Sequence, residues 1–102
     1  MAKAYLVVRA EVPEAERERF EHWYATDHLP WAIRAFKAAR GWRCWSRTDP
    51  GIHHAFYEFP DVASAEAIIA TGAINPLAVD FDRVWGSRVP RRREILEVAQ
   101  EG

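Results

Sequence analysis

The stretch EHWYATDHLP, residues 21–30, decides how this chain is interpreted, because in it a helix with two adjacent aromatic residues runs into a proline. Proline lacks an amide hydrogen and has φ fixed near the helical value, so it suits the first turn of a new helix better than the interior of an old one. The sequence therefore predicts a break just before Pro30 and a second helix over residues 30–39. Asp27 and His28 lie side by side at this break, a pairing from which acid/base sites are commonly built.

The helix that leads into this stretch has an apolar stripe. Its members fall at i, i+3, i+4 and i+7: Phe20, Trp23, Tyr24 and Asp27. A stripe with this spacing is typical of a helix that faces a core. His22 lies about 200° from Phe20 around a helix that turns about 100° per residue, so we expect it to point to solvent.

Signals elsewhere in the chain give the order βαββαβ. Runs rich in β-branched and aromatic residues predict strands over residues 4–10, 42–47, 52–59 and 91–99. The turn sequence TDPG at residues 48–51 joins the middle two strands as a hairpin. Between the last two strands we expect a helix capped by Asp61, then a second one capped by Asn75, with Ile74 packed against Val79.

This order predicts an α+β fold, a single domain over residues 1–102 with a four-stranded antiparallel sheet and helices on one face. The other face is left bare. Both alternations of the strands are apolar, since Tyr5 and Val7 oppose Leu6 and Val8. A large apolar sheet face is usually covered, and a second copy is the simplest cover. We therefore expect a homodimer built sheet to sheet; the alternative is a monomer whose bare face is a ligand platform.

Composition narrows the class of protein. Hydrophobic residues make up 49% and charged residues 28% of the 102 positions, which indicates a globular chain, and five tryptophans favour contact with a ligand or a second subunit. The net charge of -1 gives no electrostatic reason to expect a nucleic acid or an anionic membrane as partner. The chain has no apolar stretch near the roughly 20 residues of a membrane span and no signal peptide, so we expect a soluble, cytoplasmic protein.

Three features together resemble the dimeric α/β-barrel superfamily of ferredoxin-like folds over nearly the whole chain. They are the βαββαβ order, the WY pair at 23–24 followed by DHLP at 27–30, and the hairpin that ends in FYEF at 56–59. Within that superfamily the chain resembles EthD-like and related small families. The resemblance implies a dimer with a cavity for a small aromatic or polyketide-like molecule. Members include cofactor-free monooxygenases, isomerases, polyketide cyclases and haem-degrading enzymes, so the fold does not choose the reaction.

Each predicted catalytic residue has two interpretations. His28 is either a general base near neutral pH or a ring that bonds a free carbonyl at the helix break. Tyr24 is either a proton donor or a packed core residue, and Asp27 either orients an imidazole or caps a helix. His53 and His54 are adjacent in a strand and face opposite sides, and His54 is the second choice for a catalytic imidazole because it shares a face with an aromatic residue.

Aromatic side chains suited to stacking on such a molecule are Trp23, Trp45 and Phe56, although a tryptophan in a strand is more often part of the core. Arg9 either forms a cross-strand ion pair with Glu58 or steers a carboxylate group of a ligand.

The sequence predicts no metal site, because its histidines and its one cysteine have none of the usual ligand spacings. It predicts no cofactor either, except that the resemblance leaves open a haem with His28 or His54 as axial ligand. Two further functions stay open: a non-catalytic dimer that binds a small molecule, and an RNA-binding module of the same βαββαβ order. For RNA, residues 55–59 match the end of the aromatic pattern, whereas residues 52–54 do not match its beginning.

Overall fold

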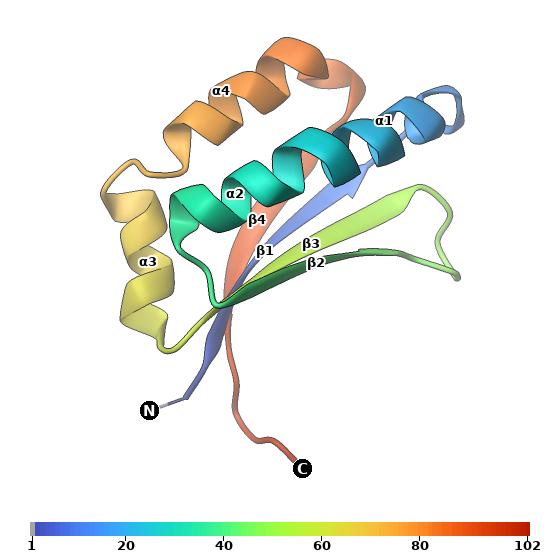
Figure 1. The fold of residues 1–102 in the computed structure, drawn as a ribbon. Coiled ribbons are helices and arrows are strands. Elements are labelled where there is room, and N and C mark those ends of the chain that lie inside the picture. Colours follow the sequence, from blue (N-terminus) through green and yellow to red (C-terminus); the bar gives the residue numbers. More distant parts are fainter. Residues whose placement is uncertain (1) are drawn as a thin grey trace.

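A computed structural model describes residues 2–102, which form one sheet and several helices (Figure 1). The strands are β1 (Ala4–Glu11), β2 (Arg40–Trp45), β3 (Ile52–Phe59) and β4 (Arg91–Glu97). The α-helices are α1 (Arg17–Trp23), α2 (Leu29–Phe36), α3 (Val62–Ala70) and α4 (Asn75–Val84). Three short helical turns complete the chain: η1 (Glu14–Glu16), η2 (Tyr24–His28) and η3 (Gly86–Arg88).

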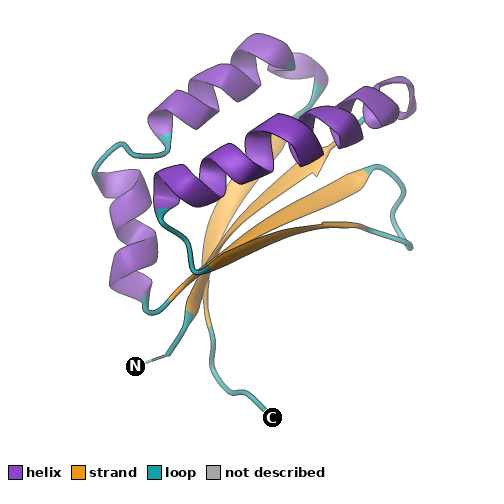
Figure 2. Ribbon diagram, in the orientation of Figure 1, coloured by secondary structure: helices purple, strands orange, loops and turns teal. Residues whose placement is uncertain are grey.

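The four strands form one antiparallel sheet in the order β2-β3-β1-β4. All the helices of the described chain lie on one side of this sheet, and the other side carries none of them (Figure 2). The predicted α+β, ferredoxin-like arrangement is therefore confirmed. The strand register determines which side chains face the helices. Leu6 pairs with Tyr57, and both face the helices. Val7 pairs with Phe56, and both lie on the outer face.

The core lies between the sheet and the helices. Its largest fully buried side chains come from both layers: Phe20, Tyr24 and Phe81 from the helices, Trp85 from the end of α4, and Leu6, His53 and Tyr57 from the strands. No described helix is long and apolar enough by itself to cross a membrane; the bent pair α3 and α4 reaches that length only together, and both helices carry core residues.

The predicted helix break before Pro30 is wrong. α1, η2 and α2 form one continuous helical run, in which η2 is a π-helical turn and the Leu29 amide donates to the carbonyl of Tyr24, five residues back. In a regular α-helix the ring of Pro30 would clash with the carbonyl of Thr26, and the wider π turn relieves this contact. Proline therefore changes the pitch of this helix instead of ending it.

The end of the run also differs from the prediction. α2 stops at Phe36, and Lys37 takes the left-handed conformation with φ of 53°, so that β2 begins at Arg40. Gly41 lies inside β2 and does not terminate a helix. A Cβ atom there would come within 2.7 Å of Ile33 Cγ1, so glycine allows β2 to approach α2.

The two predicted helix caps have different outcomes. Asp61 caps α3, since its carboxylate accepts a hydrogen bond from the Ser64 amide at 2.7 Å. The cap at Asn75 is wrong, because α4 begins at that residue and no side chain caps it. The contact predicted between Ile74 and Val79 is wrong as well, because Val79 is 66% exposed while Ile74 is buried.

Candidate functional site

A cavity of about 670 Å³ lies between the helices and the sheet. Its walls come from η2, α2 and α4 on the helical side and from β1, β3 and β4 on the sheet side, with the segment 86–90 at one end. In Figure 1 this is the region where α4 and the α1–α2 run lie side by side above β1 and β4. The polar and charged residues that line it include Tyr24, His28, Tyr57, Asp82, Arg91 and Arg93.

The π turn places His28 in the cavity wall. Buried residues recur at every fourth position of the helical run: Phe20, Tyr24, His28, Ala32 and Phe36. In a regular α-helix each such step would advance about 40° beyond a full turn, so the first and last would lie about 160° apart. The π turn at η2 has more residues per turn than an α-helix, so it reduces the angle by which these buried positions drift around the helix axis. His28 thus stays on the inner face below Tyr24, whereas Asp27 is exposed.

His28 is held by aromatic rings, and its side chain has no hydrogen-bond partner within the described residues 2–102. The imidazole is 6% exposed and stacks on the Trp23 indole, with ring centroids 4.5 Å apart and an angle of 23° between the planes. Nδ1 is buried without a hydrogen-bond partner among the described residues. Burial lowers the pKa of His28 to about 4, with the Arg91 charge acting in the same direction and Asp80 against it. The imidazole is therefore neutral at pH 7.

Two tyrosine hydroxyl groups meet in the same wall. Tyr24 and Tyr57 have their hydroxyl oxygens 3.4 Å apart, and either one can be the donor. Burial raises the pKa of Tyr24 to about 12 and moves that of Tyr57 well above its usual value. Both groups keep their protons at neutral pH, so whichever hydroxyl accepts in this pair can donate its own hydrogen bond to a ligand atom that carries negative charge.

A hydrogen-bonded network of Glu21, Arg43 and His53 contacts the ring of Tyr24. Arg43 lies against Glu21 at 2.6 Å, and its other Nη atom lies 3.2 Å from Nε2 of His53. Arginine only donates, so His53 accepts at Nε2 and carries its proton on Nδ1. Burial, followed by the Arg43 charge, lowers the pKa of His53 to about 3. The ring of His53 packs 4.8 Å from that of Tyr24 and thereby fixes the position of the phenol.

The mouth of the cavity is basic. Arg91 donates to Asp82 at 2.6 Å and to the Ala78 carbonyl at 3.3 Å, and its guanidinium lies 4.1 Å from the centre of the Phe81 ring. Arg93 lines the same mouth. This end of the cavity can therefore attract an anionic group.

The structure brings together only part of the predicted site. Tyr24 and His28 line the cavity, and Trp23 lies behind His28. Asp27 is exposed and makes no side-chain hydrogen bond among residues 2–102, so it neither caps a helix nor orients an imidazole there. Trp45 faces the helices but donates to Glu21 at 2.7 Å, outside the cavity.

The other predicted site residues lie on the opposite side of the sheet. His54, Phe56 and Arg9 face outward, since in the register Arg9 pairs with His54. The predicted ion pair between Arg9 and Glu58 is wrong: Arg9 is 3.6 Å from Glu11, and Glu58 is 3.6 Å from Arg40. The prediction failed because Arg9 and Glu58 lie four register steps apart along β1 and β3.

Sequence reasoning missed several cavity residues. Tyr57 belongs to the strand alternation opposite to Phe56, and both alternations are aromatic, so the pattern did not select it. The arginines at residues 91–93 were not selected from the sequence either, and Arg91 is half-buried against Phe81. The useful signal was the position of these charges at the start of an edge strand, which follows the helix with Phe81 after one short turn, η3.

The residues do not fit a haem. His54 lies on the outer face, so only His28 could reach a group in the cavity. An axial imidazole is usually oriented by a hydrogen bond from its other nitrogen, and Nδ1 of His28 has none. Among residues 2–102 no three His, Cys, Asp or Glu side chains lie close enough to hold a metal ion.

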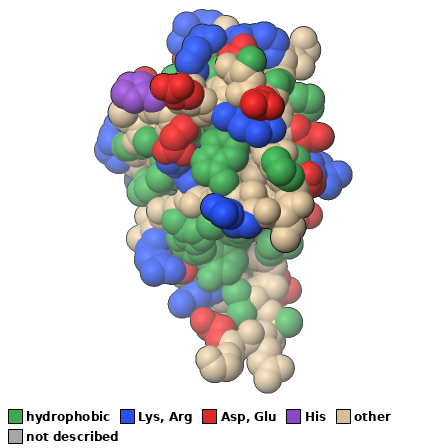
Figure 3. Space-filling view, turned by 90° about the vertical axis from the view of Figure 1, so that its right-hand side faces the viewer, with side chains coloured by type: hydrophobic (Ala, Val, Ile, Leu, Met, Phe, Trp, Pro, Cys, Tyr) green, Lys and Arg blue, Asp and Glu red, His purple; other side chains and the backbone are tan. Residues whose placement is uncertain are grey.

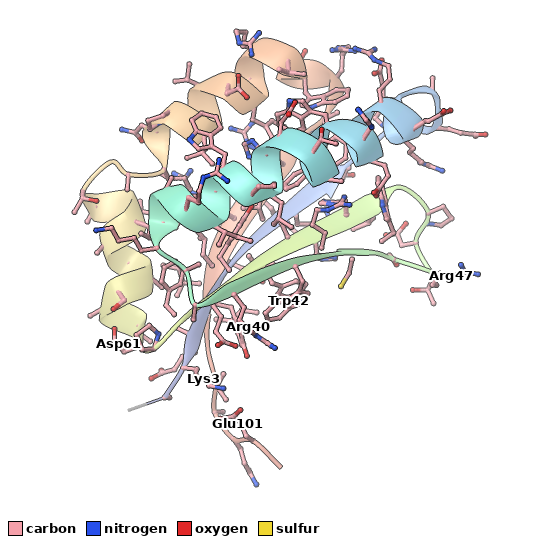
Figure 4. All side chains as sticks on the ribbon, in the orientation of Figure 1. Lys3, Arg40, Trp42, Arg47, Asp61 and Glu101 are labelled. Carbon is pink, nitrogen blue, oxygen red and sulfur yellow. The ribbon has the colours of Figure 1, made fainter. Side chains whose placement is uncertain are left out.

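The outer face of the sheet carries an aromatic cluster. Trp42 stacks on Phe56 with centroids 5.5 Å apart, Tyr5 meets Trp42 edge-on at 5.6 Å, and His54 stacks on Phe56 at 6.0 Å. The guanidinium of Arg40 lies 4.8 Å from the Trp42 ring centre. Figure 4 shows Arg40 and Trp42 projecting from β2 on the side away from the helices.

No protein-family profile matches the chain, and no curated protein matches its sequence. Solved structures do match it over nearly its whole length. A dimeric ferredoxin-like protein from an uncultured marine organism is 17% identical with a TM-score of 0.71, and the match covers 100% of both chains. An EthD family protein from Bacillus halodurans is 15% identical with a TM-score of 0.68, covering 92% of this chain and 97% of that one.

A variant of SnoaB, a cofactor-independent oxygenase from Streptomyces nogalater, is 16% identical with a TM-score of 0.65, covering 97% of this chain and 95% of that one. At such identities the likeness shows the fold. The chain has the ferredoxin-like α+β fold of these proteins, and the resemblance predicted from residues 21–30 and the βαββαβ order is confirmed at that level.

Proposed function

We propose that this protein binds a small aromatic or polyketide-like molecule in the cavity and removes a proton from it, without a cofactor. The observation that carries the proposal is the wall in which a neutral, buried imidazole, His28, has its ring 4.9 Å from that of Tyr24, whose hydroxyl group meets that of Tyr57. An apolar pocket with a few convergent polar groups and a titratable residue of shifted pKa is the usual form of an active site.

In this proposal His28 is the general base. The proton leaves an acidic C–H or O–H bond of the substrate for the unprotonated nitrogen of the imidazole, and the electron pair stays on the substrate as an enolate or phenolate. A hydroxyl group of Tyr24 or Tyr57 then donates a hydrogen bond to the oxygen that gains negative charge. Because its pKa is low, His28 holds the proton weakly and returns it readily.

Two reactions can follow from the same anion. It can react with dioxygen, which gives an oxygenated product, or it can take back the proton at another atom, which gives an isomer. The structural likeness to a protein described as a cofactor-independent oxygenase favours the first. The shared step is proton abstraction, and this is the step to test.

Anthrone is a suitable probe, because it is a tricyclic ketone with an acidic CH2 group between two aromatic rings. We expect the protein to accelerate exchange of these protons with deuterated water under argon, followed by NMR, and to consume oxygen in air. His28→Gln should lower the exchange rate at least tenfold while the protein stays folded. His22→Gln, on an exposed position of the same helical run, is the matched control and should keep the rate.

Other results would point elsewhere. If His28→Gln exchanges as fast as the unchanged protein, His28 is not the base. If the protein binds anthrone but does not accelerate exchange, it is a binding protein and not an enzyme.

The aromatic cluster on the outer face supports a homodimer formed sheet to sheet, as does the likeness to a protein described as dimeric. By the strand register this face also carries equal numbers of arginines and glutamates: Arg9, Arg40, Arg92, Glu11, Glu58 and Glu94. Such a balance suits a second copy of the same surface better than an RNA backbone. Acidic and basic side chains are also interspersed on the end of the molecule in Figure 3.

A further inference from the structure

Positive charge is concentrated at the mouth of the cavity. The whole chain has a net charge of -1. Three arginines and one aspartate border the cavity: Arg91, Arg92, Arg93 and Asp82. Because the strand register turns Arg92 to the outer face, the charges on the cavity side are those of Arg91, Arg93 and Asp82, a net charge of +1. A slightly acidic protein therefore collects basic groups at the place where a ligand enters, and this favours anionic ligands.

Arg91 is already engaged in the cavity wall. Its guanidinium donates to Asp82 and to the Ala78 carbonyl and packs on the face of Phe81, and its side chain is only 21% exposed. The nearest acid therefore neutralises this arginine, and its contacts fix it in place. Arg91 shapes the entrance, and its contacts with Asp82, Ala78 and Phe81 hold its guanidinium in the wall.

Arg93, unlike Arg91, has a guanidinium that is not engaged with an acidic residue of the described cavity wall. It pairs with Val8 across β1 and β4, so it lies on the helical side of the sheet, and Val8 itself lines the cavity. Its side chain is exposed, and among residues 2–102 it makes no ion pair or side-chain hydrogen bond. Arg92 points to the outer face, where it is in register with Arg9. Arg93 is thus the uncommitted cation on the cavity side.

We infer that the ligand of this cavity is an aromatic or polycyclic carboxylate, held by Arg93. This inference rests on the proposed function and specifies its substrate class. The carboxylate pairs with the guanidinium of Arg93 at the mouth, where two parallel hydrogen bonds fix its orientation. The ring system enters the apolar cavity, so that its far end comes to His28 and to the hydroxyl groups of Tyr24 and Tyr57.

Two probes that share one ring system separate charge from ring binding. 2-Naphthoate and 2-naphthamide differ little in size, but only the former is charged at neutral pH. By isothermal titration calorimetry we expect the naphthoate to bind about tenfold more tightly, a difference of about 1.4 kcal/mol. Arg93→Gln should reduce the affinity for naphthoate to that for naphthamide and leave naphthamide binding unchanged. Arg93→Lys should keep part of the preference because it keeps the charge.

Arg47→Gln is the matched control. It makes the same change in net charge at an exposed position in the loop between β2 and β3, which Figure 4 labels and which does not line the cavity. This variant should bind naphthoate as the unchanged protein does. Equal weakening by Arg47→Gln and Arg93→Gln would overturn the inference, because the effect would then come from net charge alone.

The remaining outcomes separate the inference from the proposed function. If the unchanged protein binds both probes equally, the carboxylate preference is wrong and binding of aromatic molecules in the cavity stands. If neither probe binds at millimolar concentration, both the inference and the proposed cavity function are overturned. If naphthoate binds through Arg93 but anthrone exchange does not depend on His28, the inference stands and the proposed catalytic step fails.

Discussion

At the scale of single residues, the two buried histidines decide how the fold responds to acid. Burial holds the pKa of His28 near 4 and that of His53 near 3, both below the value of about 6.5 for an exposed histidine. Between these values the unfolded chain takes up protons that the folded chain does not. The free energy of unfolding therefore falls as the pH drops from about 6.5 to about 4.

Replacing His28 should remove its share of this dependence. We expect the unchanged protein to lose on the order of 2 kcal/mol more stability between pH 7 and pH 4.5 than His28→Gln does, by urea denaturation at each pH. His22 is exposed, so His22→Gln should retain the full pH dependence. Identical slopes for His28→Gln and the unchanged protein would mean that His28 titrates normally in the folded state.

Some of the site could be predicted from residue types and some could not. Tyr24 and His28 follow from the helix in which they lie, whose apolar stripe points inward. The choice between His53 and His54 depends on which alternation of β3 meets the core, and both alternations carry aromatic residues. Only the packing of the helices on the sheet decides this, which is why His53 was overlooked beside Tyr24.

At the scale of elements, the strands and their order follow from the sequence, and the helical run through residues 17–36 does not. Hydrophobic alternation and the TDPG turn locate β1 and the β2–β3 hairpin within a few residues. The proline rule predicts a break because it considers only α-helical geometry. A π turn accommodates Pro30 with the chain still helical, and nothing in the local pattern of residues distinguishes these two solutions.

Pro30→Ala tests whether the proline maintains the π turn. Alanine restores an amide that can bond to the Thr26 carbonyl, so a regular α-helical turn becomes available. We expect the protein to stay folded and His28 to turn relative to the Trp23 indole, which NMR would detect as a change in the chemical shifts of the imidazole protons. Pro60→Ala, at an exposed position after β3, should leave these shifts unchanged. Unaltered shifts in Pro30→Ala would show that the π turn does not depend on the proline.

At the scale of the whole molecule, the sheet separates the core from an outer aromatic surface. One face covers the core and the cavity, and the other, which carries no helix in Figure 2, presents the aromatic cluster around Trp42 and Phe56. Exposed aromatic clusters of this kind mark contact surfaces. This is the scale at which the sequence alone predicted most, since the bare apolar face follows from the βαββαβ order.

Phe56→Glu should disrupt the proposed dimer. A charge placed in the centre of the aromatic cluster would have to be buried without a partner, which is strongly unfavourable. We expect the unchanged protein to sediment as a dimer and Phe56→Glu as a folded monomer. Val79→Glu, an equally charged change at an exposed apolar position of α4, should remain dimeric. An unchanged protein that sediments as a monomer at micromolar concentration would contradict the sheet-to-sheet arrangement.

β1 runs through the middle of the sheet and serves both surfaces with alternate residues. Leu6, Val8 and Ala10 face the helices, while Tyr5, Val7 and Arg9 face outward. Substitutions at separate positions of this one strand can therefore alter two proposed properties independently, the ligand preference of the cavity and self-association through the outer face. The same arrangement makes the strand intolerant of a one-residue insertion or deletion, which would exchange the two sets of side chains and damage both properties at once.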